Sequence, residues 1–138
     1  MKQIFNKLIF IITISLIFSE IYEGYLLYSP GGGGGGQGGG NNSHYTRLID
    51  NEQNIIHEWE HSRGCASMPY LRQDSILVYP YRVQNPTMDT GGVGGGVQYV
   101  SWGGEVLWDY VLSDNTYQHH HDIDVLPNGN ILMVAWER

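Results

Sequence analysis

The sequence predicts an all-β protein, and two observations lead to this fold class. From Tyr45 onward, four segments each contain two short apolar strands separated by a polar turn, a pattern typical of antiparallel hairpins. They span residues 45–59, 69–82, 97–110 and 122–137. The fourth has the strongest turn signal, because Asn128 and Gly129 readily adopt the positive φ angles of a tight turn. The second observation is that no segment combines a helical period with helix caps.

Three segments precede the hairpins. Residues 1–19 are typical of a secretory signal peptide: Lys2 and Lys7 come first, and the apolar run at 8–18 is shorter than the roughly 20 residues of a membrane-spanning helix. We therefore expect a secreted or periplasmic location, with an uncleaved anchor as the alternative. Residues 20–30 predict a short strand that stops at Pro30. Residues 31–44 predict a glycine-rich, low-complexity loop without a phosphate-binding motif.

The charge of the chain limits its partners. The sequence has 14 acidic and 7 basic residues, a net charge of −7, and loss of the signal peptide would make it more acidic. Such a chain repels nucleic acid and anionic membrane surfaces, so we expect neither as a partner. Cys65 is the single cysteine. It is either a buried apolar residue or one half of a disulfide to sequence outside this chain.

The hairpins also repeat along the sequence. Residues 54–59 resemble 105–110 at an offset of 51, and residues 70–78 resemble 125–133 at an offset of 55. A unit of about 50 residues with four short strands is typical of a β-propeller blade. Residues 45–138 therefore predict about two four-stranded blades of a larger ring, because a closed propeller needs about four blades or more. A small sandwich of two hairpin pairs is the alternative.

The segment QHHHDIDVLPNGN holds the densest set of chemical groups. Alternation along a strand predicts His119 and His121 on one face and His120 on the other. Imidazole N–H groups could stabilise an anion, and a carboxylate of Asp122 or Asp124 could fix an imidazole tautomer. The alternatives are zinc binding by His119, His121 and Asp122, and a polar surface without a function.

Other polar and aromatic residues are assigned mainly to structure. The glycine segment at 91–96 either lets the chain approach a neighbour closely or forms an anion-binding concavity from its amides. His57 aligns with Trp108 in the repeat, which predicts a packing position, whereas His61 is expected in a solvent-facing loop. The tryptophans recur at strand ends, which predicts packing between blades rather than a ligand platform.

Four stretches together resemble the arylsulfotransferase family of propeller proteins: GYLLYSP, TRLIDNEQNIIHEW, GGVGGGVQYVSWGGEVLWDY and HHHDIDVLPNGNILMVAWE. The resemblance runs from Gly24 to Glu137 apart from the glycine tract, and the last stretch carries its most specific motif. It implies an exported, six-bladed propeller that moves a sulfuryl group from a phenolic sulfate ester to a phenol through a sulfated histidine. Because the chain covers only the first part of such a protein, we expect an N-terminal fragment that is inactive alone.

The resemblance implies roles for individual residues. His121 and His120, with Asp122, are predicted to be catalytic, and His119 is predicted to bind the substrate. Arg72 and Arg82 are also predicted to bind it, because a guanidinium suits an oxyanion; two ordinary surface arginines are the alternative.

The expected partners follow from this assignment. They are a phenolic sulfate, a phenol acceptor and the remaining blades; a homodimer stays open, and we expect no metal and no cofactor. A non-catalytic propeller that binds a ligand or scaffolds partners is the competing function, since a fold does not fix a function. A truncated product without a stable fold is the third alternative.

Overall fold

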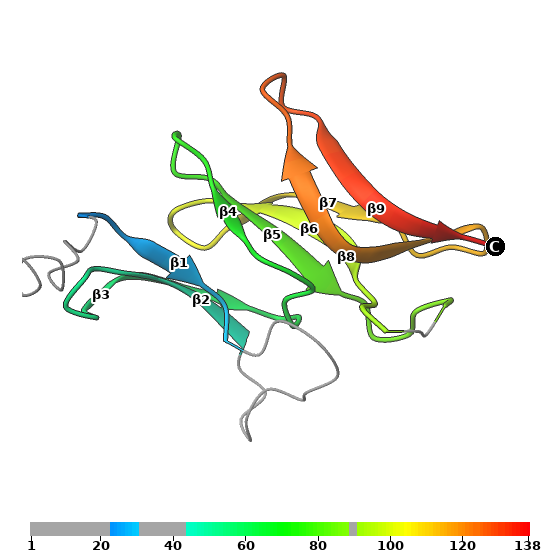
Figure 1. The fold of residues 1–138 in the computed structure, drawn as a ribbon, viewed down its shortest axis with the longest axis horizontal. Helices are drawn as coiled ribbons and strands as arrows, with labels where there is room; N and C mark the ends of the chain where they lie inside the picture. Colours follow the sequence, from blue (N-terminus) through cyan, green and yellow to red (C-terminus); the bar gives the residue numbers. More distant parts are fainter. Residues whose placement is uncertain (1–22, 31–43, 89–90) are drawn as a thin grey trace, which may run out of the picture.

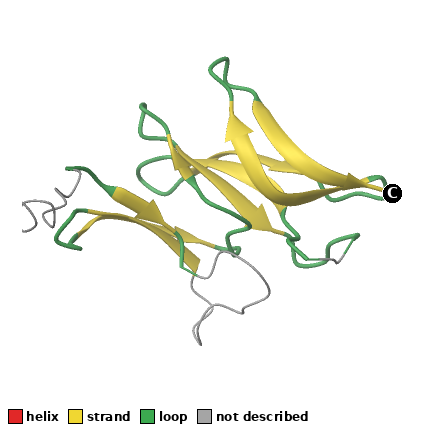
Figure 2. Cartoon of the chain, in the orientation of Figure 1, coloured by secondary structure: helices red, strands yellow, loops and turns green. Residues whose placement is uncertain are grey.

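The computed structural model describes residues 23–30, 44–88 and 91–138. Within these residues the chain consists of strands and loops, without a helix (Figure 2). The predicted all-β fold class is therefore confirmed. The predicted signal peptide at 1–19 and nearly all of the predicted glycine-rich loop at 31–44 lie outside the described residues. The strand predicted within 20–30 is present at Leu26–Tyr28.

The described residues form three antiparallel sheets, none of which closes on itself (Figure 1). The first has the order β1-β2-β3, formed by Leu26–Tyr28, His44–Ile49 and Ile55–His61. The second has the order β4-β5-β6-β7, formed by Tyr70–Leu71, Leu77–Arg82, Gly95–Val100 and Val106–Val111. The third is the hairpin β8-β9, formed by Tyr117–Val125 and Ile131–Glu137. The second sheet lies between the other two (Figure 1).

The four predicted hairpins are present, but they combine differently from the predicted blades. We expected β2-β3 to join β4-β5 in one sheet and β6-β7 to join β8-β9 in another. Instead β4-β5 pairs onward with β6-β7. The reason is that residues 62–69 carry the chain away from β3 to the next sheet, so β3 and β4 are not neighbours. One four-stranded sheet is present in the described residues rather than two, and these residues do not show a propeller.

All four hairpins turn with the same hydrogen bonds. In each turn, the backbone carbonyl of the first residue accepts a hydrogen bond from the amide of the residue three positions later. The amide of the same first residue donates to the carbonyl of the residue four positions later. The first residues of the four turns are Asp50, Arg72, Ser101 and Leu126. The fourth turn residue has a positive φ in every case: Gln53 (67°), Ser75 (62°), Gly104 (87°) and Gly129 (85°). Asn128 was also predicted to have a positive φ, but it does not. Its Oδ1 instead accepts a hydrogen bond from the amide of Asn130 (3.0 Å).

The repeat recurs in the geometry, with one corrected offset. β2-β3 and β6-β7 match at the offset of 51, including a register shift between Leu48 and Ile49 in one hairpin and between Tyr99 and Val100 in the other. β4-β5 and β8-β9 match at an offset of 54 rather than 55, because their turns begin at residues 72 and 126. The correction matters, since a shift of one residue moves every side chain of a strand to the opposite face.

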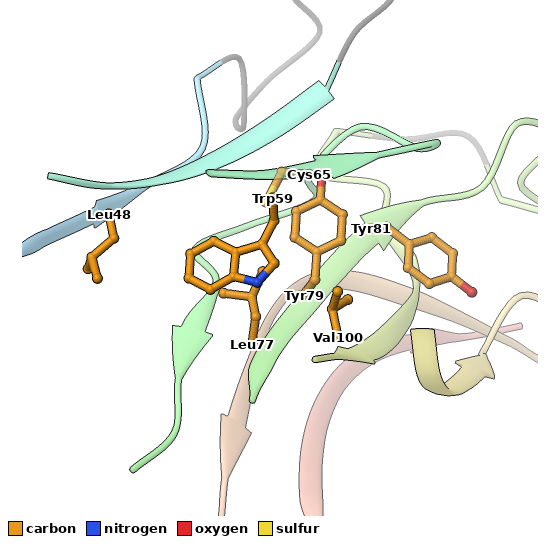
Figure 3. Close-up of a cluster of buried hydrophobic side chains, with 7 residues drawn as sticks. All are labelled: Leu48, Trp59, Cys65, Leu77, Tyr79, Tyr81 and Val100. Atoms are coloured by element: carbon orange, nitrogen blue, oxygen red, sulfur yellow. The ribbon is translucent and has the colours of Figure 1, made fainter. Parts of the chain in front are cut away.

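Two clusters of buried apolar side chains hold the three sheets together. The first lies between the first and second sheets and contains Leu48, Trp59, Cys65, Leu77, Tyr79, Tyr81 and Val100 (Figure 3). The second lies between the second sheet and β8-β9 and is built on Val78, Val97 and Ile123. Successive side chains of β5 point into one cluster and then the other, so every residue at 77–81 is buried.

Cys65 packs as a buried apolar residue. It is 5% exposed, and its Sγ donates to the carbonyl of Ser67. Burial raises the pKa of the Cys65 thiol. The structure thus supports the first of the two alternatives for this cysteine, because a thiol enclosed by Tyr79 and Trp59 is shielded from a second chain.

His61 was predicted in a solvent-facing loop, and this is wrong. β3 extends to His61, whose ring is 8% exposed and stacks on Tyr79 with ring centroids 3.6 Å apart. Its Nε2 lies 2.9 Å from Oγ1 of Thr46, which in turn contacts Oγ of Ser29 at 2.6 Å. Burial lowers the pKa of His61 to about 4. The strand pairing of β3 with β2 continues to His61 and carries the ring into the core.

Candidate functional site

Backbone hydrogen bonds fix the triple-histidine segment to the glycine segment. The amide of Gly94 donates to the carbonyl of His119 (3.0 Å), and the amide of His121 donates to the carbonyl of Gly92 (2.8 Å). The two segments form an antiparallel bridge between these bonds. The histidines of β8 therefore lie against the chain that leads into β6.

His119 is fully buried. Its Nδ1 accepts a hydrogen bond from the amide of Gly95 (3.1 Å). Because Nδ1 accepts, the neutral ring carries its proton on Nε2, and this N–H has no acceptor among the described residues. Burial lowers the pKa of His119, against a smaller opposing effect of the nearby backbone carbonyl of Asp122. His119 is therefore a neutral imidazole whose buried Nε2–H makes no well-formed hydrogen bond to the described residues.

The strict alternation predicted for the three histidines is wrong. His121 has a positive φ of 58°, and the pairing of β8 with β9 shifts between His119 and Ile123. This bulge brings the rings of His120 and His121 together, with centroids 4.2 Å apart and planes at 88°. Nδ1 of His121 lies 2.9 Å from Nε2 of His120. The two histidines predicted to be catalytic thus form a contacting imidazole pair.

The two rings of this pair have different environments. His120 is partly buried, with its ring centroid 4.0 Å from that of Trp136 on β9. Desolvation lowers the pKa of His120, and the neighbouring His121 lowers it further. His121 is exposed, and its Nε2 makes no hydrogen bond to the described residues. A neutral His120 can therefore accept the Nδ1 proton of His121 and leave the lone pair on Nε2 of His121 free.

Asp122 contacts hydroxyl groups rather than an imidazole. Its Oδ1 accepts hydrogen bonds from Oγ of Ser67 (3.1 Å) and the hydroxyl of Tyr70 (3.4 Å). Tyr70 also donates to the carbonyl of Ile123 (3.0 Å). These bonds tie β8 to the chain before β5, and Asp124, the other predicted tautomer-fixing carboxylate, is exposed. The catalytic role of Asp122 stays a prediction.

The two arginines predicted to bind substrate lie at opposite ends of β5. Arg82 ends the strand and pairs with Gly95, the residue whose amide bonds His119, and Arg82 Nε is buried without an acceptor. Arg72 lies in the turn before β5, where it forms an ion pair with Asp74 at 2.8 Å. Roughly 17 Å of strand separates the two ends at the usual rise per residue. Only Arg82 lies next to the histidine segment.

The glycine segment at 91–96 allows close approach, the simpler of the two predicted roles. A Cβ on Gly92 would lie 1.7 Å from the ring of His121, and a Cβ on Gly94 would lie 2.3 Å from the ring of His119. The amides of Gly94 and Gly95 already bond His119. They are therefore not available to form an anion-binding concavity.

Within residues 23–30, 44–88 and 91–138, no three His, Cys, Asp or Glu side chains come together in a way that could hold a metal ion. The geometry explains why His119, His121 and Asp122 do not converge: the first faces Gly95, the second His120, and the third Ser67. The same part of the chain has no helix that is long and apolar enough to cross a membrane.

An aromatic groove beside the third sheet was not predicted from the sequence. Its volume is about 470 Å³, and it is lined by Tyr99, Trp108, Tyr110, Leu112, Gly129, Asn130, Ile131 and Met133. The rings of Trp108 and Tyr110 are nearly parallel, 5.9 Å apart, and 42% and 45% exposed. The tight turn at 101–104 was the sequence signal that could have predicted this groove, because it places Tyr99 opposite Trp108 on one face of the hairpin. The prediction that the tryptophans pack between blades rather than form a ligand platform passed over this surface.

Comparisons with protein-family models, curated proteins and solved structures found no match to this chain.

Proposed function

We propose that this chain is part of a sulfotransferase that moves a sulfuryl group from a phenolic sulfate ester to a phenol. The observation that carries the proposal is two buried N–H donors without acceptors among the described residues, Nε2 of His119 and Nε of Arg82. Both residues neighbour Gly95, whose amide bonds the His119 ring and which lies opposite Arg82 in the pairing of β5 with β6. Buried donors are almost always paired. The non-bridging oxygens of a sulfuryl group are suitable partners, since they accept hydrogen bonds and gain charge in the transition state.

The imidazole pair supplies a nucleophile in this proposal. Nε2 of His121 attacks sulfur, the N–S bond forms, and the S–O bond to the aryl group breaks with its electron pair leaving on the phenolate. His121 becomes positively charged in this step, and its Nδ1 proton passes to Nε2 of His120 at 2.9 Å. The lowered pKa of His120 keeps that ring neutral, and so ready to accept the proton.

The second half of the reaction reverses these roles. The oxygen of the acceptor phenol attacks sulfur, the N–S bond to His121 breaks with its electron pair staying on nitrogen, and the phenol proton passes to solvent water. The proton on His120 returns to Nδ1 of His121, so both rings regain their starting state. No cofactor is needed, because the sulfuryl group passes directly from donor to histidine to acceptor.

Ligand binding without catalysis is the second candidate function, and the aromatic groove favours it. A volume of about 470 Å³ with mostly apolar and aromatic walls falls within the range of small-molecule sites. The groove lies at the start of β9, whereas Trp136, which contacts His120, lies near the end of that strand. A ligand held there would be separate from the histidine pair.

Covalent labelling distinguishes the two candidates. The purified chain would be incubated with 4-nitrophenyl sulfate, and the release of nitrophenolate and the intact mass would be followed together. The half-reaction with the donor ester needs only the histidine pair and its neighbouring donors, so we expect one added sulfuryl group even on this chain alone, and peptide mapping should place it on His121. Onward transfer to a phenol is expected only of the complete propeller. His121→Asn should remove the label, and Arg82→Met should slow labelling by about 100-fold through loss of a transition-state donor.

His57→Asn is the matched control, because His57 lies on β3 and bonds the carbonyl of Trp102 instead. It should label like the unmodified chain. Absence of a sulfuryl group on His121 and His120, or equal labelling of the His121→Asn variant, would exclude the histidine mechanism. Saturable binding of the ester without its cleavage would favour the ligand-binding function.

A further inference from the structure

The first and third sheets are incomplete in complementary ways. In the four-stranded second sheet, the hairpin β4-β5 is followed by the hairpin β6-β7. The third sheet contains only β8-β9, the counterpart of β4-β5. The first sheet contains β2-β3, the counterpart of β6-β7, beside a β1 of 3 residues. Within the described residues, each outer sheet thus has the hairpin that the other lacks.

In the complete sheet, the hairpin β6-β7 also covers the aromatic face of β3. Nε1 of Trp59 donates to the carbonyl of Ser101 (3.0 Å), and Nε2 of His57 bonds the carbonyl of Trp102 (2.8 Å). The rings of His57 and Trp102 stack with centroids 3.9 Å apart. The turn of the added hairpin therefore closes over two side chains of the preceding sheet.

The counterparts of these two covered side chains line the aromatic groove. At the offset of 51, His57 corresponds to Trp108 and Trp59 corresponds to Tyr110. Trp59 is 1% exposed, whereas Tyr110 is 45% exposed. The groove is thus the position where a hairpin like β6-β7 would lie beside β9.

The edge of the molecule at this position is unusually apolar. All residues of β7 are exposed, and the strand VLWDYV has one charged side chain, Asp109, which accepts a hydrogen bond from Tyr81 inside the sheet. On β9, Leu132 and Val134 are 56% and 54% exposed. Soluble proteins usually protect such edges with charges or cover them with another segment.

We infer that the isolated chain of residues 1–138 associates head to tail with a second copy of itself. The β2-β3 hairpin of the second copy adds to the edge of β9 and supplies the hairpin that a further blade would otherwise provide. The pairing of β5 with β6 gives the register after the two offsets are applied. Ile131 then lies opposite Ile49 of the second copy, and Ala135 lies opposite Tyr45. Within one copy, Val100 packs beside Trp59. Ile49 of the second copy takes the corresponding place in the contact between copies, where it fills the groove over Trp108 and Tyr110 of the first copy.

The edge of β2 that this pairing needs is only partly occupied. β1 pairs with Arg47–Ile49 and leaves His44–Thr46 without a neighbour on that side among the described strands. β9 can pair along all of His44–Ile49, so the exchange replaces a pairing of 3 residues with one of 6. Short edge strands such as β1 commonly protect a sheet edge from pairing with another chain. Displacement of β1 by β9 of another copy would resemble donor-strand exchange.

Charge sets the conditions for this association. Two copies with a net charge of −7 repel each other at long range, and salt screens that repulsion. Self-association should therefore strengthen as sodium chloride is added. Because the contact joins two different surfaces, it produces open chains or closed rings rather than a twofold dimer.

Disulfide trapping tests the register directly. Two variants, Ala135→Cys and Tyr45→Cys, would be mixed under mild oxidation. Directly opposed residues on antiparallel strands lie about 4.5–5.5 Å apart between Cα atoms, which suits a disulfide. We expect a covalent dimer containing one copy of each variant. Glu52→Cys replaces Tyr45→Cys as the control, because Glu52 is an exposed turn residue outside the predicted pairing. The buried native Cys65 should stay reduced.

Sedimentation velocity tests the groove. The unmodified chain should associate with rising concentration, and Trp108→Ala should raise the dissociation constant at least about tenfold, as expected for a central aromatic anchor. Leu107→Ala is the matched control, since Leu107 is also exposed (55%, against 42% for Trp108) but points to the other face of β7. Circular dichroism checks that each variant keeps its strand content, and Tyr110→Ala replaces Trp108→Ala if that variant does not fold. A monomer at all concentrations, or equal trapping of Tyr45→Cys and Glu52→Cys, would overturn the inference.

Discussion

Gly92→Ala tests whether the position of His121 requires a residue without a side chain. Gly92 has a φ of +80°, a left-handed conformation that costs about 1–2 kcal/mol for an L-residue. The new Cβ would also lie 1.7 Å from Cε1 of His121. Because the methyl group and the ring cannot both keep these places, the ring must move and the contact with His120 is lost. We expect the free energy of unfolding to fall by about 2 kcal/mol or more.

Denaturant unfolding followed by tryptophan fluorescence measures this loss, and NMR signals of the imidazole rings report on the His120–His121 contact. Gly91→Ala is the control, since a Cβ at Gly91 would meet nothing within 4 Å. It should change the free energy of unfolding by less than about 0.5 kcal/mol. If Gly92→Ala matches Gly91→Ala in stability and keeps the native imidazole signals, the proposed fit between the glycine and histidine segments is wrong.

Three further results are expected. Ser75→Gly and Gln53→Gly should each raise the free energy of unfolding by about 0.5–1 kcal/mol. Glycine removes the energetic cost of a left-handed backbone at the turn, although it loses more conformational entropy on folding. Denaturant midpoints measure the change, and a lower midpoint would contradict this prediction. The pKa of His61 is lowered from 6.5 to about 4, so its contribution to stability is complete above pH 6.5 and is lost as the pH falls towards 4, by about 3 kcal/mol. Unfolding at several pH values should show a flatter slope for His61→Phe, and an unchanged slope would refute this assignment. Sulfate at a hundredfold excess over its Kd should stabilise the chain by about 2.7 kcal/mol; thermal melts should show no such gain for Arg82→Met, or for sodium chloride at equal ionic strength.

Local sequence patterns were sufficient to predict the hairpins. Alternating apolar residues and short polar turns identify each pair of strands, and the sequence Asn128-Gly129 marks one turn directly. The assembly of hairpins into sheets was not predictable in the same way. A strand that alternates every second residue shows which face is buried, but it does not show which neighbouring edge it pairs with. The path of residues 62–69 decides that β4 leaves β3, and this segment has no periodic pattern.

The site was predictable in composition but not in geometry. The sequence showed where the imidazoles and carboxylates gather. The positive φ of His121 and the register shift after His119 were not predictable, since a positive φ is uncommon even for histidine, which adopts it more often than most residues, and three adjacent histidines do not show which one would adopt it. The contacts of Asp122 were also hidden, because Ser67 is 55 positions away in the chain. The need for glycine at positions 92 and 94 could be explained only once the positions of the His121 and His119 rings against them were known.

The shared turn geometry has a consequence for how the chain folds. Each hairpin closes within a few residues through the same pair of turn hydrogen bonds, so each can form early and independently, on the microsecond scale of hairpins in general. Joining β5 to β6 must instead close the longer connection at residues 83–94, a slower step because more chain entropy is lost before contacts form. Amide protection should therefore appear first within the four hairpins and later between them. In that order of events, the glycine and histidine segments meet only when the sheets assemble, and the imidazole pair is among the last features to form.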